Sequence, residues 1–199
     1  FGLPQRRRRV FVVASLSGSP ADVLLSDSGS LEHQELTLEK PIGFYWTEGK
    51  FSTGLAADAV PPLKGGSTIG IPSPPAILMP SGLAGMPDIE DAEALQGFPR
   101  GWTAPVADAH RESLRWRLVG NAVPTNVVEW LGRKLINPAA YDGEADRELK
   151  EVGTWPDAAW GCAGKRFESS ATHVPMGATR VSLDTCLQKD LKPLSVRAT

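Results

Sequence analysis

Four consecutive arginines near the start of the chain are the residues best suited to bind an anion or the polar edge of a ring. They follow a glutamine and lead directly into a short apolar run. Alternate side chains of an extended segment share a face, so Gln5, Arg7 and Arg9 would point one way. The other face would carry Arg6 and Arg8. Because guanidinium groups hold planar, fixed donors, both faces suit phosphates or bases.

The apolar run, residues 10–14 (Val-Phe-Val-Val-Ala), is rich in β-branched side chains. Its composition predicts a strand covered on both faces, as in a parallel sheet. Without that context, four arginines would most simply be a solvated or phosphate-binding basic run. Because they enter a buried strand, we expect them at the edge of a site and not in a disordered tail.

Two further stretches carry residue types that are typical of a binding site. Residues 114–124 read Leu-Arg-Trp-Arg-Leu-Val-Gly-Asn-Ala-Val-Pro, although Gly-Asn before a proline also suits the start of an ordinary helix. Residues 94–99 read Ala-Leu-Gln-Gly-Phe-Pro and are followed by Trp102. For Phe98 and Trp102 the simplest interpretation is that of core aromatics.

Taken in their order along the chain, the three stretches resemble the last blocks of the DNA (cytosine-5) methyltransferases. The resemblance covers about residues 1–136. It departs from the family pattern where the usual Thr-Pro-Arg-Glu helix start is replaced by Pro87-Asp88-Ile89-Glu90 and the acids that follow. It implies an α/β fold: the latter part of a Rossmann-like, S-adenosylmethionine-dependent methyltransferase sheet with a small, mostly β, loop-rich target-recognition domain.

The resemblance also implies roles for individual residues. Arg9 would reach the flipped-out target cytosine, Arg7 would support the catalytic pocket, and Gln5 would help to hold the local backbone. Such donors replace the pairing that a base loses when it leaves the duplex, and they stabilise charge that develops on its ring. The final block would close one side of the S-adenosyl-L-methionine pocket through Gly120, Asn121, Ala122 and Val123.

The chain is expected to fall into four parts. Residues 1–15 would end the catalytic sheet, 16–86 would form the target-recognition region, 87–136 would return to the catalytic domain, and 137–199 would be an extension of unknown role. The second part is rich in Gly, Pro, Ser and Thr, with short apolar pieces at 42–46, 68–71 and 76–79. The partner would be double-stranded DNA, contacted by Arg6, Arg8, Lys50, Lys64, Gly65, Gly66 and Ser67. The Lys and Gly positions among these equally suit solvated hairpin tips.

Two helices are predicted in the third part. One spans residues 87–96, with a proline and acids in its first turn and a glycine at its end. The other is entered through Asn121 and runs to about Leu135, with Val127, Val128 and Leu131 on the same face as Leu135. Beyond it, turns are predicted at 155–156 and 160–161.

Composition excludes several classes of protein. A formal net charge of -2 argues against a DNA coat protein, and 41% hydrophobic residues are enough for a core. Two cysteines supply neither a disulfide framework nor a four-ligand zinc site. No apolar run approaches the roughly 20 residues of a membrane helix. We expect a cytoplasmic protein, encoded by a bacterium or phage and typical of restriction-modification, with no metal and no membrane partner.

Several blocks of the family are missing. Its nucleophilic cysteine follows a proline, whereas Cys162 follows a glycine and Cys186 a threonine, and both come after the final block. A Glu-Asn-Val run and a Gly-rich cofactor turn are also missing. We therefore expect the C-terminal part of a longer enzyme, inactive alone and dependent on a part that carries the cysteine. The alternatives are a non-catalytic DNA-binding or regulatory remnant, and an interaction subunit whose residues 10–14 pair with a partner sheet.

Overall fold

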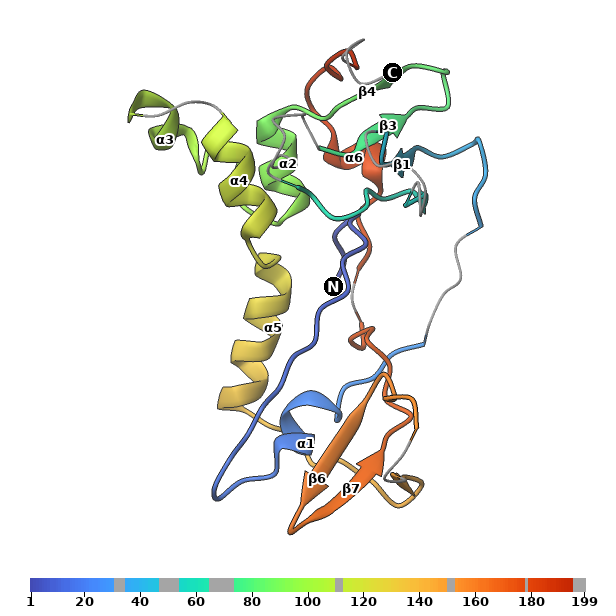
Figure 1. The fold of residues 1–199 in the computed structure, drawn as a ribbon, viewed down its shortest axis with the longest axis vertical. Coiled ribbons are helices and arrows are strands. Elements are labelled where there is room, and N and C mark those ends of the chain that lie inside the picture. The colour runs from blue at the N-terminus through green and yellow to red at the C-terminus, as the bar shows by residue number, and fades with distance from the viewer. Residues whose placement is uncertain are drawn as a thin grey trace. The chain divides into compact units, whose positions relative to one another are not determined.

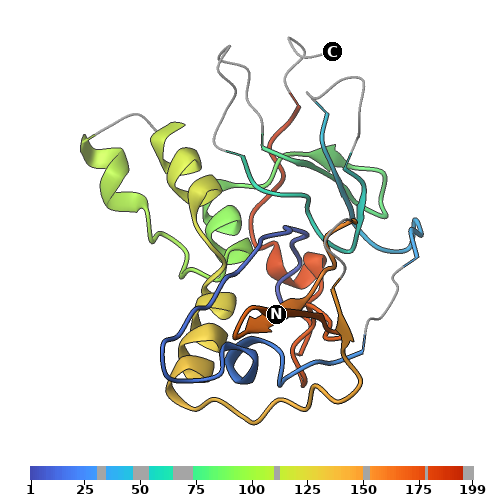
Figure 2. The same cartoon turned by 60° about the horizontal axis from the view of Figure 1, so that its bottom comes forward.

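The computed structural model describes residues 1–30, 35–46, 54–64, 74–109, 113–149, 153–177 and 179–194. The fold is mixed α/β, and both of its described sheets are antiparallel (Figures 1 and 2). The chain forms two compact units from interleaved stretches of sequence. The first unit comprises Phe1, Arg9–His33 and Val127–Thr179. The second comprises Gly2–Arg8, Gln34–Asn126 and Arg180–Thr199.

A four-stranded sheet lies in the second unit, with the order β2-β1-β3-β4. These strands are β1 (Ile42–Phe44), β2 (Ala56–Ala57), β3 (Ala76–Leu78) and β4 (Ala84–Gly85). Two of the three predicted apolar pieces are therefore strands, while residues 68–71 lie outside the described residues. Gly43 pairs with Ile77 across the sheet, and a Cβ at Gly43 would lie 2.3 Å from the Ala59 carbonyl oxygen. The close approach of the backbone at this point requires glycine.

The helices of this unit are α2 (Ile89–Leu95), α3 (Ala104–Ala109), α4 (Ser113–Asn121) and α6 (Leu183–Cys186). The position of α2 confirms the first predicted helix. The Asp88 side chain caps it by accepting a hydrogen bond from the Glu90 backbone N–H at 2.9 Å. The chain leaves α2 through Gly97, whose φ of +84° suits glycine.

The core of the second unit draws on residues from the middle and last of its three stretches. Its buried members are Val60, Leu63, Ile77, Ile89, Ala92, Leu95, Val119, Leu183 and Cys186. The last two come from α6, within a segment that we call the strap (residues 180–194). The strap pairs with Met86 through two backbone hydrogen bonds between Met86 and Lys192, both 2.8 Å. The extension 137–199, for which the sequence indicated no role, therefore contributes core residues to this unit.

The first unit contains α1 (Pro20–Leu24), the part of α5 (Thr125–Ile136) from Val127 onward, and a three-stranded sheet. The strands β5 (Arg147–Glu148), β6 (Ala159–Cys162) and β7 (Lys165–Glu168) have the order β5-β7-β6. Trp160 on β6 stacks on Phe167 of β7, with ring centroids 4.6 Å apart. The prediction of a turn at 160–161 is wrong, because this cross-strand pair stabilises a hairpin whose turn comes later, at 163–164.

One acidic side chain connects three segments of the first unit. The Asp27 carboxylate accepts hydrogen bonds from the Trp130 indole N–H at 3.0 Å and the Met176 backbone N–H at 2.8 Å. It also lies 3.4 Å from the Lys134 ammonium group. On the same helix, Trp130 meets Phe1 edge to face with ring centroids 5.5 Å apart. These contacts hold one side of α5 within its unit.

The strand predicted at residues 10–14 is not formed. None of these residues takes part in a β-bridge, and Val10 and Val12 are 90% and 85% exposed. A strand requires a neighbour for its backbone groups, and no described strand pairs with this segment. The parallel sheet that was expected to receive it is likewise not seen among the described residues.

Candidate functional site

The arginine segment is held extended by one residue of the second unit. The Val60 N–H donates to the Pro4 carbonyl oxygen at 2.9 Å, and the Arg6 N–H donates to the Val60 carbonyl oxygen at 2.8 Å. Together they form a parallel bridge between Gln5 and Val60. Because Val60 is fully buried in the core, this bridge fixes the segment against the centre of the unit.

The side chains follow the predicted alternation from Gln5 to Arg8, but Arg9, which was expected on the same face as Arg7, is exposed. Gln5 and Arg7 are partly buried, whereas Arg6 and Arg8 are exposed. Arg6 donates to the Leu55 carbonyl oxygen at 3.3 Å. Both amide atoms of Gln5 are buried and have no hydrogen-bond partner among the described residues.

The three sequence blocks meet at the end of α4. Arg7 donates to the Gly120 carbonyl oxygen at 2.8 Å, and the Gln96 side-chain amide donates to the Val119 carbonyl oxygen at 2.8 Å. The last turn of a helix leaves carbonyl oxygens without intrahelical donors, and these two side chains supply donors there. The backbone carbonyl oxygen of Gln96 also accepts a hydrogen bond from the N–H of Thr125, the first residue of α5, at 2.9 Å. The connection between the two helices is thus held at both ends.

The four residues predicted to face the cofactor lie at this connection. Gly120 and Asn121 are the last two residues of α4, so the prediction that Asn121 begins the following helix is wrong. The helix continues because the Gly120 carbonyl oxygen receives its donor from Arg7. The connection itself contains Ala122 and Val123, and the side chains of Asn121 and Val123 are exposed. An exposed pair on a fixed backbone is accessible to a ligand.

Close packing between blocks also depends on Gly97. A Cβ at this residue would lie 2.2 Å from the Thr125 hydroxyl oxygen, too close for any side chain. In the native contact, that hydroxyl donates to the Gly97 carbonyl oxygen at 2.9 Å. Glycine is therefore required both by the positive φ and by the approach of α5.

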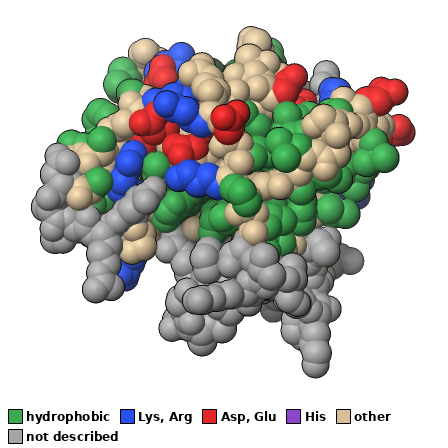
Figure 3. All heavy atoms as spheres, turned by 90° about the horizontal axis from the view of Figure 1, so that it is seen from above, with side chains coloured by type: hydrophobic (Ala, Val, Ile, Leu, Met, Phe, Trp, Pro, Cys, Tyr) green, Lys and Arg blue, Asp and Glu red, His purple; other side chains and the backbone are tan. Residues whose placement is uncertain are grey.

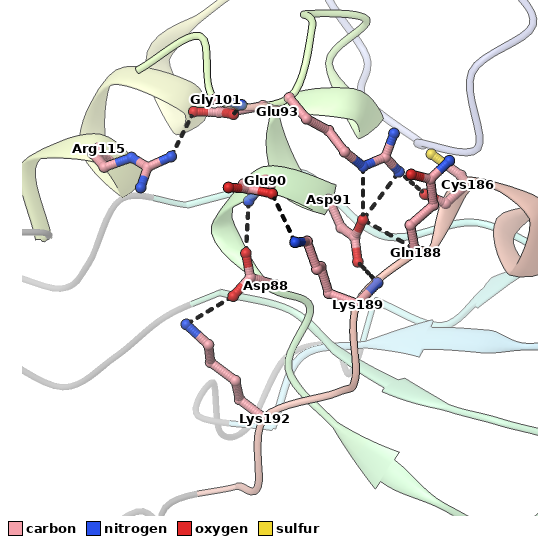
Figure 4. A network of polar contacts seen from close by, with 11 residues as sticks. Asp88, Glu90, Asp91, Glu93, Gly101, Arg115, Cys186, Gln188, Lys189 and Lys192 are labelled. Carbon is pink, nitrogen blue, oxygen red and sulfur yellow. Dashed lines mark hydrogen bonds and ion pairs between the residues drawn. The ribbon is translucent and has the colours of Figure 1, made fainter. Parts of the chain in front are cut away.

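Near the start of α4, a buried carboxylate on α2 organises the chain that follows. Glu93 is fully buried and accepts hydrogen bonds from the Gly101 N–H and the Arg115 guanidinium (Figure 4). It also accepts hydrogen bonds from the Thr103 hydroxyl and N–H. The contact with Arg115 on α4 measures 3.0 Å. Burial opposes ionisation of Glu93, but the hydrogen bonds from Thr103, Arg115 and Gly101 outweigh it and lower the pKa of the carboxyl group. The network ties α4 to α2.

A second buried carboxylate ties α2 to the strap. Asp91 accepts hydrogen bonds from Arg100 at 3.0 Å and from the backbone N–H groups of Gln188 and Lys189 at 3.1 and 3.0 Å (Figure 4). Arg100 also donates to the Cys186 carbonyl oxygen. The sequence assigned no structural role to Asp91, Arg100 or Arg115, because no local pattern shows which residues they contact.

Other predicted site residues do not contact the end of α4 in the described part of the chain. Arg9 is exposed and belongs to the first unit. Lys64 lies over the Tyr45 ring, with its ammonium nitrogen 4.3 Å from the ring centroid. Lys50, Gly65, Gly66 and Ser67 lie outside the described residues. The face drawn in Figure 3 has acidic and basic side chains close together instead of a continuous basic area.

Phe98 and Trp102 stack with ring centroids 5.9 Å apart, but they do not form core aromatics as predicted. Trp102 is 61% exposed and Phe98 is only partly buried. Gly101, with a φ of +79°, turns the chain between α2 and α3 and leaves Trp102 at the surface.

Neither cysteine is placed as a nucleophile. Cys186 is buried in the core, and burial raises the pKa of its thiol. Cys162 is exposed at the end of β6. Across the described part of the chain, no three His, Cys, Asp or Glu side chains gather to bind a metal, and no helix is long and apolar enough to cross a membrane.

The type II methyltransferase M2.BsuMI of Bacillus subtilis (strain 168) is 42% identical over 211 aligned residues, which take in 100% of this chain and 53% of the relative. The chain is homologous to about half of a type II methyltransferase. No protein-family model matches it, and no solved structure is significantly similar.

The homology to a type II methyltransferase extends over both units, since the alignment includes every residue of the chain. Residues 137–177 and the strap, which lie beyond the three sequence blocks, therefore have counterparts in M2.BsuMI. The similarity of this chain to M2.BsuMI is thus not limited to the three blocks, because it extends to the residues that follow them.

Proposed function

We propose that this chain is the target-recognition and closing part of a DNA (cytosine-5) methyltransferase, and that it acts with a further part carrying the nucleophilic cysteine. One observation carries the proposal. The blocks around Arg7, Gln96 and Gly120 are the ones that resemble this family, and the hydrogen bonds at the end of α4 join all three. The homology to a type II methyltransferase supports the general activity.

The target cytosine is assigned to the arginine segment. Arg9 holds the flipped-out base, and Arg7 fixes the wall of the pocket through Gly120. Gln5 offers a buried amide whose nitrogen can donate a hydrogen bond and whose oxygen can accept one. A fixed guanidinium stabilises negative charge that develops on the base more effectively than a flexible ammonium group does. Arg6 and Arg8, on the opposite face, neutralise DNA phosphates.

The connection between α4 and α5 fits the edge of an S-adenosyl-L-methionine pocket. Its backbone is fixed at both ends by Gln96, while the side chains of Asn121 and Val123 are exposed. Asn121 supplies amide donors and acceptors, and Val123 an apolar surface, for a ligand that has both polar and apolar parts. When bound, S-adenosyl-L-methionine supplies the methyl group.

The test is methyl transfer from labelled S-adenosyl-L-methionine to unmethylated duplex DNA. The chain is assayed alone and after co-expression with the portion of M2.BsuMI that it does not match. We expect label at C5 of cytosine only from the co-expressed pair. Arg9→Ala should lower turnover by about a hundredfold, as the loss of a fixed electrostatic donor does. Arg147→Ala, which removes an exposed arginine on β5, is the matched control.

The competing function is that of a non-catalytic DNA-binding remnant. It would be favoured by sequence-specific DNA binding of the isolated chain together with the absence of methyl transfer from the co-expressed pair. Label on adenine or on the exocyclic nitrogen of cytosine would retain a methyltransferase but contradict the C5 assignment.

A further inference from the structure

The strap contacts both edges of the four-stranded sheet. The edge strands are β2 and β4, and each is only two residues long. Directly after β2, the Asp58 carboxylate accepts a hydrogen bond from the Leu183 N–H at 2.8 Å. Directly after β4, Met86 and Lys192 exchange two backbone hydrogen bonds, both 2.8 Å. The strap therefore connects the two edges of the sheet.

The strap approaches β4 so closely that no side chain fits between them. A Cβ at Gly85, the last residue of β4, would lie 2.7 Å from the Lys192 carbonyl oxygen and 2.8 Å from the Leu191 Cβ. The φ of Gly85 is not positive, so this glycine serves the close contact and not an unusual backbone conformation. A methyl group added at this position would push the strap away from the sheet.

The strap is also fixed to helix α2 (Figure 4). The buried Asp91 carboxylate accepts two backbone N–H groups of the strap, at 3.1 and 3.0 Å. Lys189 pairs with Glu90 at 3.2 Å, and Lys192 pairs with Asp88 at 3.0 Å. Because Asp91 is excluded from water, its bonds fix the strap on α2 more firmly than the two partly exposed ion pairs do.

A further contact joins the strap to the first stretch of the second unit. The Val181 N–H donates to the Gly2 carbonyl oxygen at 2.8 Å, and the same stretch contains Arg7. The strap thus links the sheet, α2 and the arginine segment. A sheet whose strands are two or three residues long forms few ladder hydrogen bonds, so contacts from outside the sheet determine where it lies.

We infer that the strap is a positioning element for DNA reading, which holds the four-stranded sheet against α2 and the arginine segment and so sets which base pairs the recognition region reaches. This inference rests on the proposed function, which assigns the sheet to target recognition. A side chain that reads a base edge must be held within about 0.5 Å of its productive position. A sheet released from the strap would lose discrimination between bases while the unit still bound phosphates.

The test is selection of a DNA sequence. The full chain, carrying an affinity tag, is co-expressed with the portion of M2.BsuMI that it does not match, and the preparation selects duplexes from a random pool for sequencing. We expect the unaltered chain to enrich one sequence. Gly85→Ala should lower the preference for that sequence over its single-base variants at least about tenfold. Gly132→Ala, on α5, is the matched control, because a Cβ there would meet nothing within 4 Å.

This measurement separates positioning from stability. The preference is a ratio obtained on one preparation, so a loss of folded protein lowers the recovery of all duplexes by the same factor. A purely structural strap would therefore leave the preference unchanged in Gly85→Ala, although the total recovery of DNA would fall.

A charge variant tests the inference through α2. Lys189→Glu with Lys192→Glu places like charges opposite Glu90 and Asp88. Because the two lysine side chains are 51% and 47% exposed, the variant should fold, which circular dichroism checks. We expect it to lose the sequence preference as well. Its control, Lys165→Glu with Arg166→Glu at exposed positions on β7, makes the same change in net charge away from the strap.

The outcomes decide the inference and the proposed function separately. An unchanged preference in Gly85→Ala, or in the charge variant if Gly85→Ala does not fold, would overturn the inference. So would an unaltered chain that enriches no sequence. Methyl transfer is measured on the same preparations. A preference that depends on the strap without any methyl transfer would sustain the inference and reject the proposed function, whereas label at C5 with an unchanged preference would do the reverse.

Discussion

Arg7 donates a hydrogen bond to the carbonyl oxygen of Gly120 across 113 residues of sequence. The bond joins an extended segment anchored on Val60 to the end of α4, and it places a charged donor at a helix terminus where carbonyl oxygens lack partners. The conformation of residues 120–124 therefore depends on a side chain from the first stretch of the second unit, Gly2–Arg8.

Replacement of Arg7 by alanine should loosen this connection. We expect a loss of about 1.5–3 kcal/mol in the free energy of unfolding, the usual range for a hydrogen bond to a charged group. Urea unfolding followed by fluorescence measures it. Arg117→Ala, at an exposed position on the same helix α4, should change the free energy of unfolding by no more than about 0.5 kcal/mol. Equal losses in the two variants would show that the bond to Gly120 contributes nothing of its own.

Gly97 and Gly82 form a natural pair for separating backbone strain from steric contact. Their φ angles are +84° and +85°, but a Cβ at Gly97 would lie 2.2 Å from the Thr125 hydroxyl oxygen, whereas at Gly82 it would meet nothing within 4 Å. Gly82→Ala should cost about 1–2 kcal/mol, the price of a left-handed alanine. Gly97→Ala should cost at least about 2 kcal/mol more. Thermal unfolding of both variants is the measurement, and similar melting temperatures would contradict the close contact with α5.

The stability of the second unit should fall in acid because of Glu93. Hydrogen bonds from Thr103, Arg115 and Gly101 lower its pKa despite burial, so the folded state binds the proton less readily than the unfolded chain does. The stabilisation is complete above the unfolded pKa of about 4.3 and is lost as the pH falls through the lower, folded value.

A comparison of Glu93→Gln with the unaltered chain tests this pH dependence. The variant should be less stable at neutral pH, because it leaves Arg115 without its charged partner, but it should lose less stability between about pH 5 and pH 2. Glu129→Gln, at a side chain 68% exposed on α5, serves as the control. If Glu93→Gln and the unaltered chain lost stability in parallel over this range, the lowered pKa of Glu93 would not be the cause.

We expect the strap to contribute as much to the stability of the second unit as core residues earlier in the chain do. Leu183 is fully buried with Ile77, Leu95 and Val119, and its N–H donates to Asp58 at 2.8 Å. Leu183→Ala should cost about 2–5 kcal/mol, as other large-to-small core substitutions do. Leu38→Ala, at an exposed leucine of the same unit, should cost less than about 0.5 kcal/mol. Chemical denaturation of both variants decides whether the strap is part of the cooperative fold.

Local signals in the sequence predicted the elements that local chemistry determines. The proline, cap and acids around Asp88 predicted α2, and the apolar pieces at 42–46 and 76–79 predicted β1 and β3. Prediction failed where the decisive partner was distant. Gly120 and Asn121 remain helical because Arg7 and Gln96 bind the end of α4, and residues 10–14 lack the neighbouring strand that their composition requires.

The same reasoning applies to the candidate site. The resemblance selected Gln5, Arg7 and Gly120, and their functional roles stay predictions. Alternation predicted the exposure of Arg6 and Arg8 but not that of Arg9. The buried carboxylates that fix the surrounding helices were not predictable, because Asp91 and Glu93 are simply two of several acids in an amphipathic helix. Only the fold shows that Asp91 receives backbone N–H groups from residues 188 and 189.

The strap also determines when this protein can become folded during its synthesis. The second unit uses residues near the N-terminus, a long middle stretch, and residues 180–194, so its core is incomplete until the strap has left the ribosome. Residues 127–179 of the first unit, which lie between the last two of those stretches, are translated while the core of the second unit still exposes Val60, Ile77 and Leu95. Nascent chains paused before residue 180 should therefore be open to proteases and chaperones, and release of the strap should end that exposure.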